Sequence, residues 1–167
     1  MSSWPASARL KHVEVTDLSE LHWMLGVEIK RDWHAGLIHM SQQAYINSII
    51  RRYNLDDLKP LSTPMDPTTR LTTDQSPASA IEHAIMRDKP YRKAVGALNW
   101  AALATHPNIA FAVGTVARFT ANPGIAHWEA VKWIYRYLAG THDLWLTYRE
   151  TRYVLEGYAD ADGLMVA

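Results

Sequence analysis

Adjacent carboxylates are the first residues in this chain that could do chemistry. Asp56 and Asp57 lie close to a tyrosine, and clustered carboxylates can hold two metal ions about 3.5 to 4 Å apart for reactions at phosphorus. The pair follows a segment with helical spacing, so we interpret it as a solvated loop after a helix. The eight histidines lack the spacing typical of zinc ligands, and capping or core roles are expected for His106, His127 and His142.

Four cations could contact nucleic-acid phosphates. Lys30 and Arg31 end a predicted strand, while Arg51 and Arg52 lie in the last turn of a predicted helix. Each could neutralise one phosphate in a salt-dependent contact that ignores base sequence. The alternative is that they are solvated surface cations. A basic stripe joining Lys30 to Arg51 and Arg52 would favour binding, whereas scattered charges would favour the alternative.

Aromatic side chains on the later helical segments could stack nucleic-acid bases. Alanines recur on the same segments, so packing between helices is the commoner use at such positions. We predict this core role for Trp100, Trp128, Trp133, Tyr135 and Tyr137.

The composition describes a chain that can bury a core. It has 167 residues, 48% of them hydrophobic, enough for one domain or one domain and a fragment. Seventeen basic residues balance seventeen acidic ones, so nucleic-acid binding would need a local patch. The absence of cysteine excludes disulfides and thiolate metal sites. No apolar run reaches the roughly 18 residues of a membrane span, and residues 1–9 lack a secretory apolar stretch, so we expect an intracellular, soluble protein.

Alternation and helical spacing together predict an α+β chain. Apolar side chains at every second position predict a strand over residues 20–29, in which Gly26 marks a bulge or a close backbone approach. A hairpin should connect this strand to residues 37–40. Helical spacing then runs from Ser41, the predicted cap, to Asn54.

The second half of the chain is predicted to be mainly helical. Residues 59–79, which begin with a proline-rich stretch, form the longest predicted loop. Gly140 is expected to close the last of three helices. These helices are predicted at residues 90–104, 107–120 and 125–139. Alternation over residues 144–148 and 154–160 indicates a return to strands.

A series of short motifs in residues 90–148 carries the strongest signal. The motifs are Pro90-Tyr91-Arg92, Val95-Gly96-Ala97-Leu98, Thr105-His106-Pro107-Asn108, Asn122-Pro123-Gly124, His127-Trp128 and Arg136-Tyr137-Leu138-Ala139-Gly140-Thr141. Their order resembles the Pol polyprotein of copia-type (Pseudoviridae-like) LTR retrotransposons, between the reverse transcriptase palm and the RNase H domain. The resemblance extends from about Val13 to Gly163.

The resemblance implies four consecutive parts. Residues 1–40 would form the palm edge with the primer-grip hairpin, and residues 41–89 a thumb helix with a Pro-rich loop. Residues 90–143 would form the connection helices, and residues 144–167 a truncated start of RNase H. The implied fold is α+β: an N-terminal β-hairpin, a helical thumb and connection bundle, and the C-terminal strands of an incomplete RNase H-like sheet.

The same resemblance assigns roles to the residues that would hold a template–primer. Primer-grip residues, which place the primer 3′ end, would be Leu25, Gly26, Val27 and Glu28. The cations that would contact the duplex backbone are Lys30, Arg31, Arg51 and Arg52. From spacing alone, the first four residues would simply belong to an amphipathic hairpin.

Both metal centres of the parent polyprotein are expected to be incomplete in this chain. Asp160, within Gly157-Tyr158-Ala159-Asp160-Ala161-Asp162-Gly163, matches the first of four catalytic, metal-binding RNase H carboxylates. The palm aspartates would lie upstream of Met1, and the remaining RNase H ligands beyond Ala167. The parent enzyme uses Mg²⁺, but we expect no tight metal binding in this chain.

The implied function is that of a reverse transcriptase fragment that binds RNA–DNA or DNA duplexes non-specifically and is inactive by itself. Other Pol segments or the full-length enzyme are the expected partners, in cytoplasmic virus-like particles or in the nucleus, and the fragment could act in trans. The alternative is a helical protein-interaction module, or a relic reading-frame product, without a nucleic-acid site.

Overall fold

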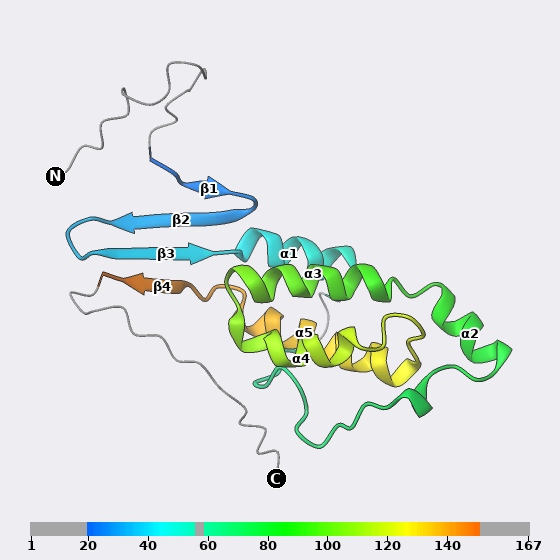
Figure 1. Cartoon of the computed structure of the whole chain (residues 1–167). Helices are drawn as coiled ribbons and strands as arrows, with labels where there is room; N and C mark the ends of the chain where they lie inside the picture. The colour runs from blue at the N-terminus through cyan, green and yellow to red at the C-terminus, as the bar shows by residue number, and fades with distance from the viewer. Residues whose placement is uncertain (1–19, 56–58, 151–167) are drawn as a thin grey trace, which may run out of the picture.

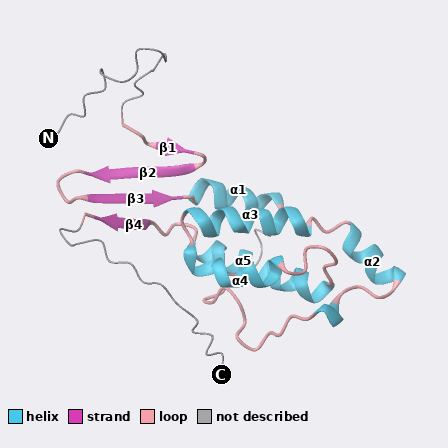
Figure 2. Cartoon of the chain, viewed as in Figure 1, coloured by secondary structure: helices cyan, strands magenta, loops and turns pink. Residues whose placement is uncertain are grey.

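The computed structural model describes residues 20–55 and 59–150. In this part of the chain a four-stranded antiparallel sheet is joined to five α-helices, which confirms the predicted α+β class (Figure 1). The sheet lies at one end of the molecule and the helices at the other (Figure 2). No helix in these two ranges has the length and apolar character needed to cross a membrane.

The sheet has the spatial order β1-β2-β3-β4. Its strands are β1 (Trp23–Met24), β2 (Val27–Asp32), β3 (Leu37–Ser41) and β4 (Leu146–Arg149). The β2–β3 pair confirms the predicted hairpin to residues 37–40. Asp32 closes its turn, because Oδ1 accepts the backbone N–H groups of His34 and Ala35, each at 2.9 Å. These bonds, led by that from Ala35, lower the pKa of Asp32.

The single strand predicted over residues 20–29 is wrong, because the chain turns back at Leu25 and Gly26. Met24 pairs with Val27, so only two residues form the connection, with φ of 52° and 82°. Two positive φ values are typical of the type I′ turn that suits a tight hairpin. Gly26 is therefore a turn residue rather than a bulge. A two-residue turn preserves the alternation of apolar side chains, which is why the pattern resembled one strand.

Strand β4 belongs to the same sheet as the hairpin. Leu146 pairs with Met40, and Arg149 pairs with Leu37, at the far end of β3 from the helices. The return to strands at residues 144–148 is thus confirmed, but this strand joins the sheet of the hairpin, whereas the resemblance placed residues 144–167 at the start of an RNase H-like sheet. Residues 154–160 lie outside the described residues.

Helix α1 (Gln43–Arg52) follows β3 directly. Ser41 ends the strand, and its hydroxyl accepts the N–H of Gln43 at 3.2 Å, while Gln42 occupies the capping position itself. Asn54 has a φ of 54° just after the helix, a left-handed conformation that asparagine tolerates better than most residues. The predicted helix is confirmed, with its cap shifted by one residue.

Residues 59–79 form the predicted loop, with one 3₁₀ turn at Thr73–Gln75. The next helix, α2 (Ala80–Arg87), was not predicted although its start carries a capping-box signature. Ser79 Oγ accepts the N–H of Glu82 at 3.2 Å, and Glu82 Oε2 accepts the N–H of Ser79 at 3.0 Å.

Three more helices complete the bundle: α3 (Tyr91–Ala104), α4 (Ala110–Ala117) and α5 (Ile125–Thr141). The helix predicted over residues 107–120 is shorter, because a 3₁₀ turn at Pro107–Ile109 precedes α4. Gly140 lies inside the last turn of α5 and does not end it. A Cβ at Gly140 would lie 3.1 Å from Cβ of Pro60, so the glycine allows the long loop to pass close to the helix.

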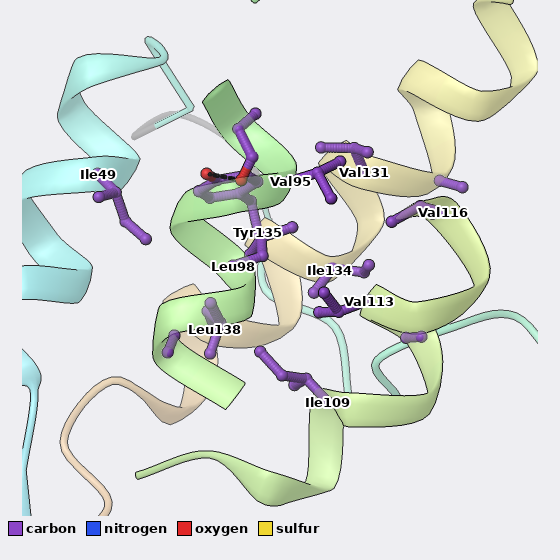
Figure 3. Packing of buried hydrophobic residues seen from close by; sticks show 14 of the residues in the cluster. Ile49, Val95, Leu98, Ile109, Val113, Val116, Val131, Ile134, Tyr135 and Leu138 are labelled. Carbon is purple, nitrogen blue, oxygen red and sulfur yellow. Dashed lines mark hydrogen bonds between the residues drawn. The ribbon is translucent and has the colours of Figure 1, made fainter. Parts of the chain in front are cut away.

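The hydrophobic core lies between α1, α3, α4 and α5 (Figure 3). Ile49, Leu98 and Ile134 are fully buried there. Tyr135 is buried as well, and its hydroxyl donates to the carbonyl of Ala94 at 3.1 Å. In the four strands of the sheet, by contrast, only Val27 and Ser41 are buried.

Candidate nucleic-acid interface

The β1–β2 turn contains the residues predicted as the primer grip. Leu25 is 76% exposed, although its φ of 52° is costly for a bulky side chain. Gly26 follows with open space around it, since an added Cβ would meet no atom within 4 Å. Val27 is buried where β2 begins, and Glu28 is half-buried. The turn thus presents one exposed side chain on a strained backbone, followed by a glycine with open space around it.

The two cations on β2 are not free charges. Lys30 Nζ lies 3.1 Å from Glu28 Oε1 and 4.2 Å from the ring centroid of Trp145. The guanidinium of Arg31 lies 3.5 Å from the ring centroid of Trp33. Because successive side chains of a strand point to opposite faces, Lys30 and Arg31 cannot contact the same ligand from one face of the sheet.

Arg51 and Arg52 lie at the other end of α1, exposed in its last turn. At 1.5 Å per residue, the helix places them roughly 12 to 14 Å further along its axis than its first residue, Gln43. Lys30 on β2 and the two arginines at the far end of α1 therefore do not form the single stripe that would favour binding, and by themselves these scattered cations favour the alternative (Figure 1). The four cations thus form two separate pairs, one on β2 and one at the end of α1.

Arg52 instead borders a groove between α1 and the first half of α3. The groove has a volume of about 650 Å³. Its lining residues are Tyr45, Arg52, Tyr53, Pro90, Lys93, Gly96 and Ala97. Lys93 is exposed and brings a second cation to the groove. Sequence reasoning missed Lys93, although a cation in the first turn of a helix that starts after a proline is readable from the chain.

The two tyrosines of the groove have fixed positions. The hydroxyl of Tyr45 donates to the carbonyl of Ala97 at 3.1 Å, and burial raises the pKa of Tyr45. Tyr53 packs edge-on against Tyr135, with ring centroids 5.5 Å apart. Neutral aromatic walls beside Arg52 and Lys93 could accept a sugar–phosphate strand.

Core roles are confirmed for two of the aromatic residues considered for base stacking. Trp128 and Tyr135 are buried between helices. Trp133 is half-buried, and its Nε1 donates to the carbonyl of Thr63 at 2.9 Å, which ties the long loop to α5. Trp100 and Tyr137 are also half-buried.

The histidines inside the motifs have structural partners. The N–H of Gly124 donates to Nδ1 of His127 at 2.8 Å, and Nε2 of the same ring donates to the carbonyl of Thr72 at 3.0 Å. His127 also stacks on Phe119, with centroids 3.9 Å apart. His142 lies 2.9 Å from the carbonyl of Ala139 through Nδ1. The predicted capping and core roles are confirmed for these histidines.

The acidic residues considered for metal binding are Asp56, Asp57 and Asp160, and all three lie outside the described residues. Within residues 20–55 and 59–150, no group of three or more histidines and carboxylates is placed to hold a metal ion. Asp66 has partners within its own loop: hydrogen bonds from Thr68, first from its hydroxyl and then from its N–H, lower the pKa of Asp66.

These features describe a broad architecture: a small antiparallel sheet that continues directly into a helical bundle, with one pair of basic residues on β2 and another at the end of α1. Comparison with known proteins is more specific. The chain is 41% identical over 152 residues to the retrovirus-related Pol polyprotein from transposon TNT 1-94 of Nicotiana tabacum, covering 91% of this chain and 11% of that protein. It is 38% identical over 150 residues to the corresponding polyprotein from transposon RE1 of Arabidopsis thaliana, covering 89% of this chain and 10% of that one.

A third relative is an uncharacterized mitochondrial protein of Arabidopsis thaliana, 30% identical over 148 residues, with 87% of this chain and 57% of that protein covered. The chain is homologous to a segment of the copia-type, retrovirus-related Pol polyproteins of plant transposons, which confirms the resemblance of its motifs. It spans about a tenth of the length of these polyproteins. No protein-family model and no solved structure matches it.

Proposed function

We propose that this chain is the part of a retrotransposon reverse transcriptase that holds a template–primer duplex. The β1–β2 turn would act as the primer grip, α1 as the first thumb helix, and α3 to α5 as the connection. The residues after β4 would begin the RNase H domain, with Asp160 as its first carboxylate. Binding would be non-specific in sequence, because it would use backbone phosphates.

The exposed, strained Leu25 carries this proposal. Strained backbone at a non-glycine residue persists where the surrounding structure enforces it, and such residues cluster at functional sites. Leu25 is neither buried nor part of the core, so packing does not account for a leucine in this conformation. It lies where the Pol resemblance puts contact with the primer end.

The groove between α1 and α3 supports the same proposal. Arg52 and Lys93 border it, and Arg51 is exposed in the same turn of α1. Two or three cations at one end of a bundle can neutralise successive phosphates, although the net charge of the chain is zero. In this arrangement the groove holds the duplex backbone, while the turn contacts the primer end.

Fluorescence anisotropy with a labelled RNA–DNA hybrid tests the proposal. Three phosphate contacts predict roughly 40-fold weaker binding at 200 mM than at 50 mM salt, from a slope of about −0.9 per contact. The triple variant Arg51→Ala, Arg52→Ala, Lys93→Ala should weaken binding at 50 mM salt and remove this part of the salt dependence.

The matched control removes three cations elsewhere. Arg70, Arg87 and Arg118 are exposed and do not line the groove. Their triple alanine variant should bind the hybrid almost as tightly as the natural chain. Equal losses in the two variants would indicate general charge attraction instead of a site. No binding at 50 mM salt would leave the helical interaction module as the better explanation.

The proposal also includes the absence of turnover by this chain alone. Two-metal chemistry needs a complete set of carboxylates, and the resemblance assigns only Asp160 of those carboxylates to this chain. The parent enzyme would use Mg²⁺, but these residues would not bind it tightly. Template-dependent primer extension on poly(rA)/oligo(dT) with Mg²⁺ or Mn²⁺ by the purified chain would disprove this part.

A further inference from the structure

A buried chain of polar side chains lies where the sheet meets the helical bundle. Gln42 connects β3 to α1, and Thr105 and His106 follow the end of α3. Thr141 ends α5 just before the chain returns toward β4. Gln42 and His106 are 1% and 2% exposed, so each hydrogen bond they lack carries a free-energy cost.

The contacts form a continuous line. Thr105 Oγ1 lies 2.9 Å from Gln42 Oε1 and 2.8 Å from His106 Nδ1. On the other side of the ring, His106 Nε2 lies 3.2 Å from the carbonyl oxygen of Thr141. The amide nitrogen of Gln42 is buried without any hydrogen-bond partner among the residues that the structure describes.

The protons available on Thr105 and His106 restrict which hydrogen bonds can form along this line of contacts. The hydroxyl of Thr105 has one proton, so it can donate either to Gln42 or to His106. If it donates to Gln42 while the imidazole is neutral, Nδ1 must carry the ring proton. Nε2 would then place a lone pair against the carbonyl oxygen of Thr141, and Gln42 Nε2 would remain without an acceptor.

Two other states avoid this repulsion. In the first, a neutral ring with its proton on Nε2 donates to Thr141, Thr105 donates to Nδ1, and the Gln42 amide is turned by 180° so that its nitrogen donates to Thr105. In the second, the ring carries both protons and donates at both nitrogens, and Thr105 donates to Gln42 Oε1. The hydrogen bonds between Gln42, Thr105 and His106 thus run in opposite directions in the two states.

We propose that His106 is a proton-operated joint between the sheet and the helical bundle: protonation of its ring reverses hydrogen bonds in the buried chain that connects the two parts. With a neutral ring, the bonds run from Gln42 through Thr105 and His106 to Thr141. A second proton on His106 reverses the first two bonds and rotates the amide of Gln42, next to the last residue of β3. This role is independent of nucleic-acid binding.

The surroundings favour the neutral state at pH 7. Burial lowers the pKa of His106 below its ordinary value of 6.5, opposed only in part by the carbonyl of Thr141. No charged side chain among the described residues contributes to this shift. The titratable groups near Thr141 in the chain are Tyr137 on α5, whose hydroxyl accepts a hydrogen bond from Asn108, and His142 and Asp143 just after the helix. Nδ1 of His142 lies 2.9 Å from the carbonyl oxygen of Ala139. The carbonyl of Thr141 also accepts the N–H of Leu144 at 3.1 Å, just before β4.

NMR of the intact chain, with labelled histidine and glutamine, tests the joint. At pH 7.5 the ring of His106 should show the Nε2–H tautomer. On acidification, the side-chain amide resonances of Gln42 should shift with the same midpoint as the ring. An Nδ1–H tautomer at pH 7.5, or a Gln42 amide that does not respond, would overturn the proposal.

Two controls separate the joint from a structural role. Thr105→Ser keeps the hydroxyl and should retain the shared midpoint, whereas Thr105→Val should leave the Gln42 amide insensitive to the ring. Persistent coupling in the valine variant would also overturn the proposal. His127 reports on folding in each variant, because the N–H of Gly124 fixes its tautomer. The tautomer and the shared midpoint of His106 and Gln42, both measured in the natural chain, decide the issue even if a variant fails to fold.

Discussion

The helical bundle and the sheet are built in different ways. The bundle buries a continuous core from α1, α3, α4 and α5, whereas the sheet buries one residue at β2 and one at β3. Exposed aromatic residues are commoner in the sheet and its turns, at Trp23, Trp33 and Tyr148, and the β1–β2 turn holds the strained backbone of Leu25. The difference indicates that the bundle supplies most of the stability and that the sheet is the less stable part.

The largest expected effect tests the core of the bundle. Ile134→Ala should lower the free energy of unfolding by roughly 2–5 kcal/mol, because it leaves a cavity at a fully buried position. The same change at the half-buried Ile38 of β3 should cost only about 1 kcal/mol. Urea denaturation of both variants measures the difference. Equal costs would show that the sheet is as much a part of the core as the bundle.

The next effect tests close packing of the long loop against α5. A Cβ at Gly124 would lie 1.8 Å from the carbonyl oxygen of Gln75, so Gly124→Ala should destabilise by about 3 kcal/mol. Gly114 is the matched control, since a Cβ there meets nothing within 4 Å. Because it lies inside α4, Gly114→Ala should stabilise by about 0.5–1 kcal/mol. Thermal unfolding would contradict the expected packing if both variants shifted in the same direction.

The pH dependence tests the polar contacts that tie loops to helices. Burial lowers the pKa of His106 and His127, so below pH 6.5 the unfolded chain binds more protons than the folded one. Stability is therefore full above pH 6.5 and is lost as the pH falls, by at most about 1.4 kcal/mol per pH unit for each ring. Urea midpoints between pH 7.5 and 5.5 measure this loss.

Variants assign the pH effect to the buried rings. His106→Gln should reduce the slope, whereas His83→Gln, at an exposed position on α2, should leave it unchanged. The carboxylates titrate near 4 in the unfolded chain, below this range. If the natural chain and both variants showed the same slope of stability against pH, the effect would not arise from His106.

The smallest effect concerns the strained turn of the sheet. Leu25→Asn should stabilise the hairpin by roughly 0.5–1 kcal/mol, because asparagine accepts the positive φ of a type I′ turn better than leucine does. If Leu25 contacts the primer end, the same variant should bind the RNA–DNA hybrid more weakly. Calorimetry measures the stability of the variant, and fluorescence anisotropy on the same sample measures its binding of the hybrid. A gain in stability without a loss of binding would remove Leu25 from the proposed site.

Patterns in the sequence predicted those parts of the fold that depend on residues close together in the chain. The β2–β3 hairpin, α1, α3 and most of α5 follow from periodicity and end signals within about 20 residues. The helix missed by this reasoning, α2, carried the readable signal of Ser79 and Glu82. The error at Leu25 had a different cause, since alternation is the same through a two-residue turn.

The candidate site was less predictable than the fold. Arg51 and Arg52 were correctly expected at the end of α1, but the sequence left open whether Lys30 joins them, and Lys30 lies on the sheet, paired with Glu28. The cation that borders the groove with Arg52 is Lys93, 41 positions later in the chain. Such a pair arises only when α1 and α3 pack side by side.

The sequence alone determined the α+β class, the order of the main elements and the relationship to copia-type Pol polyproteins, because periodicity and motif order are local properties. The tertiary structure decided that β4 completes the sheet of the hairpin, that Arg52 and Lys93 share a groove, and that His106 connects Gln42 to Thr141. These contacts join residues that are far apart in the chain, and burial, not spacing, selects their partners.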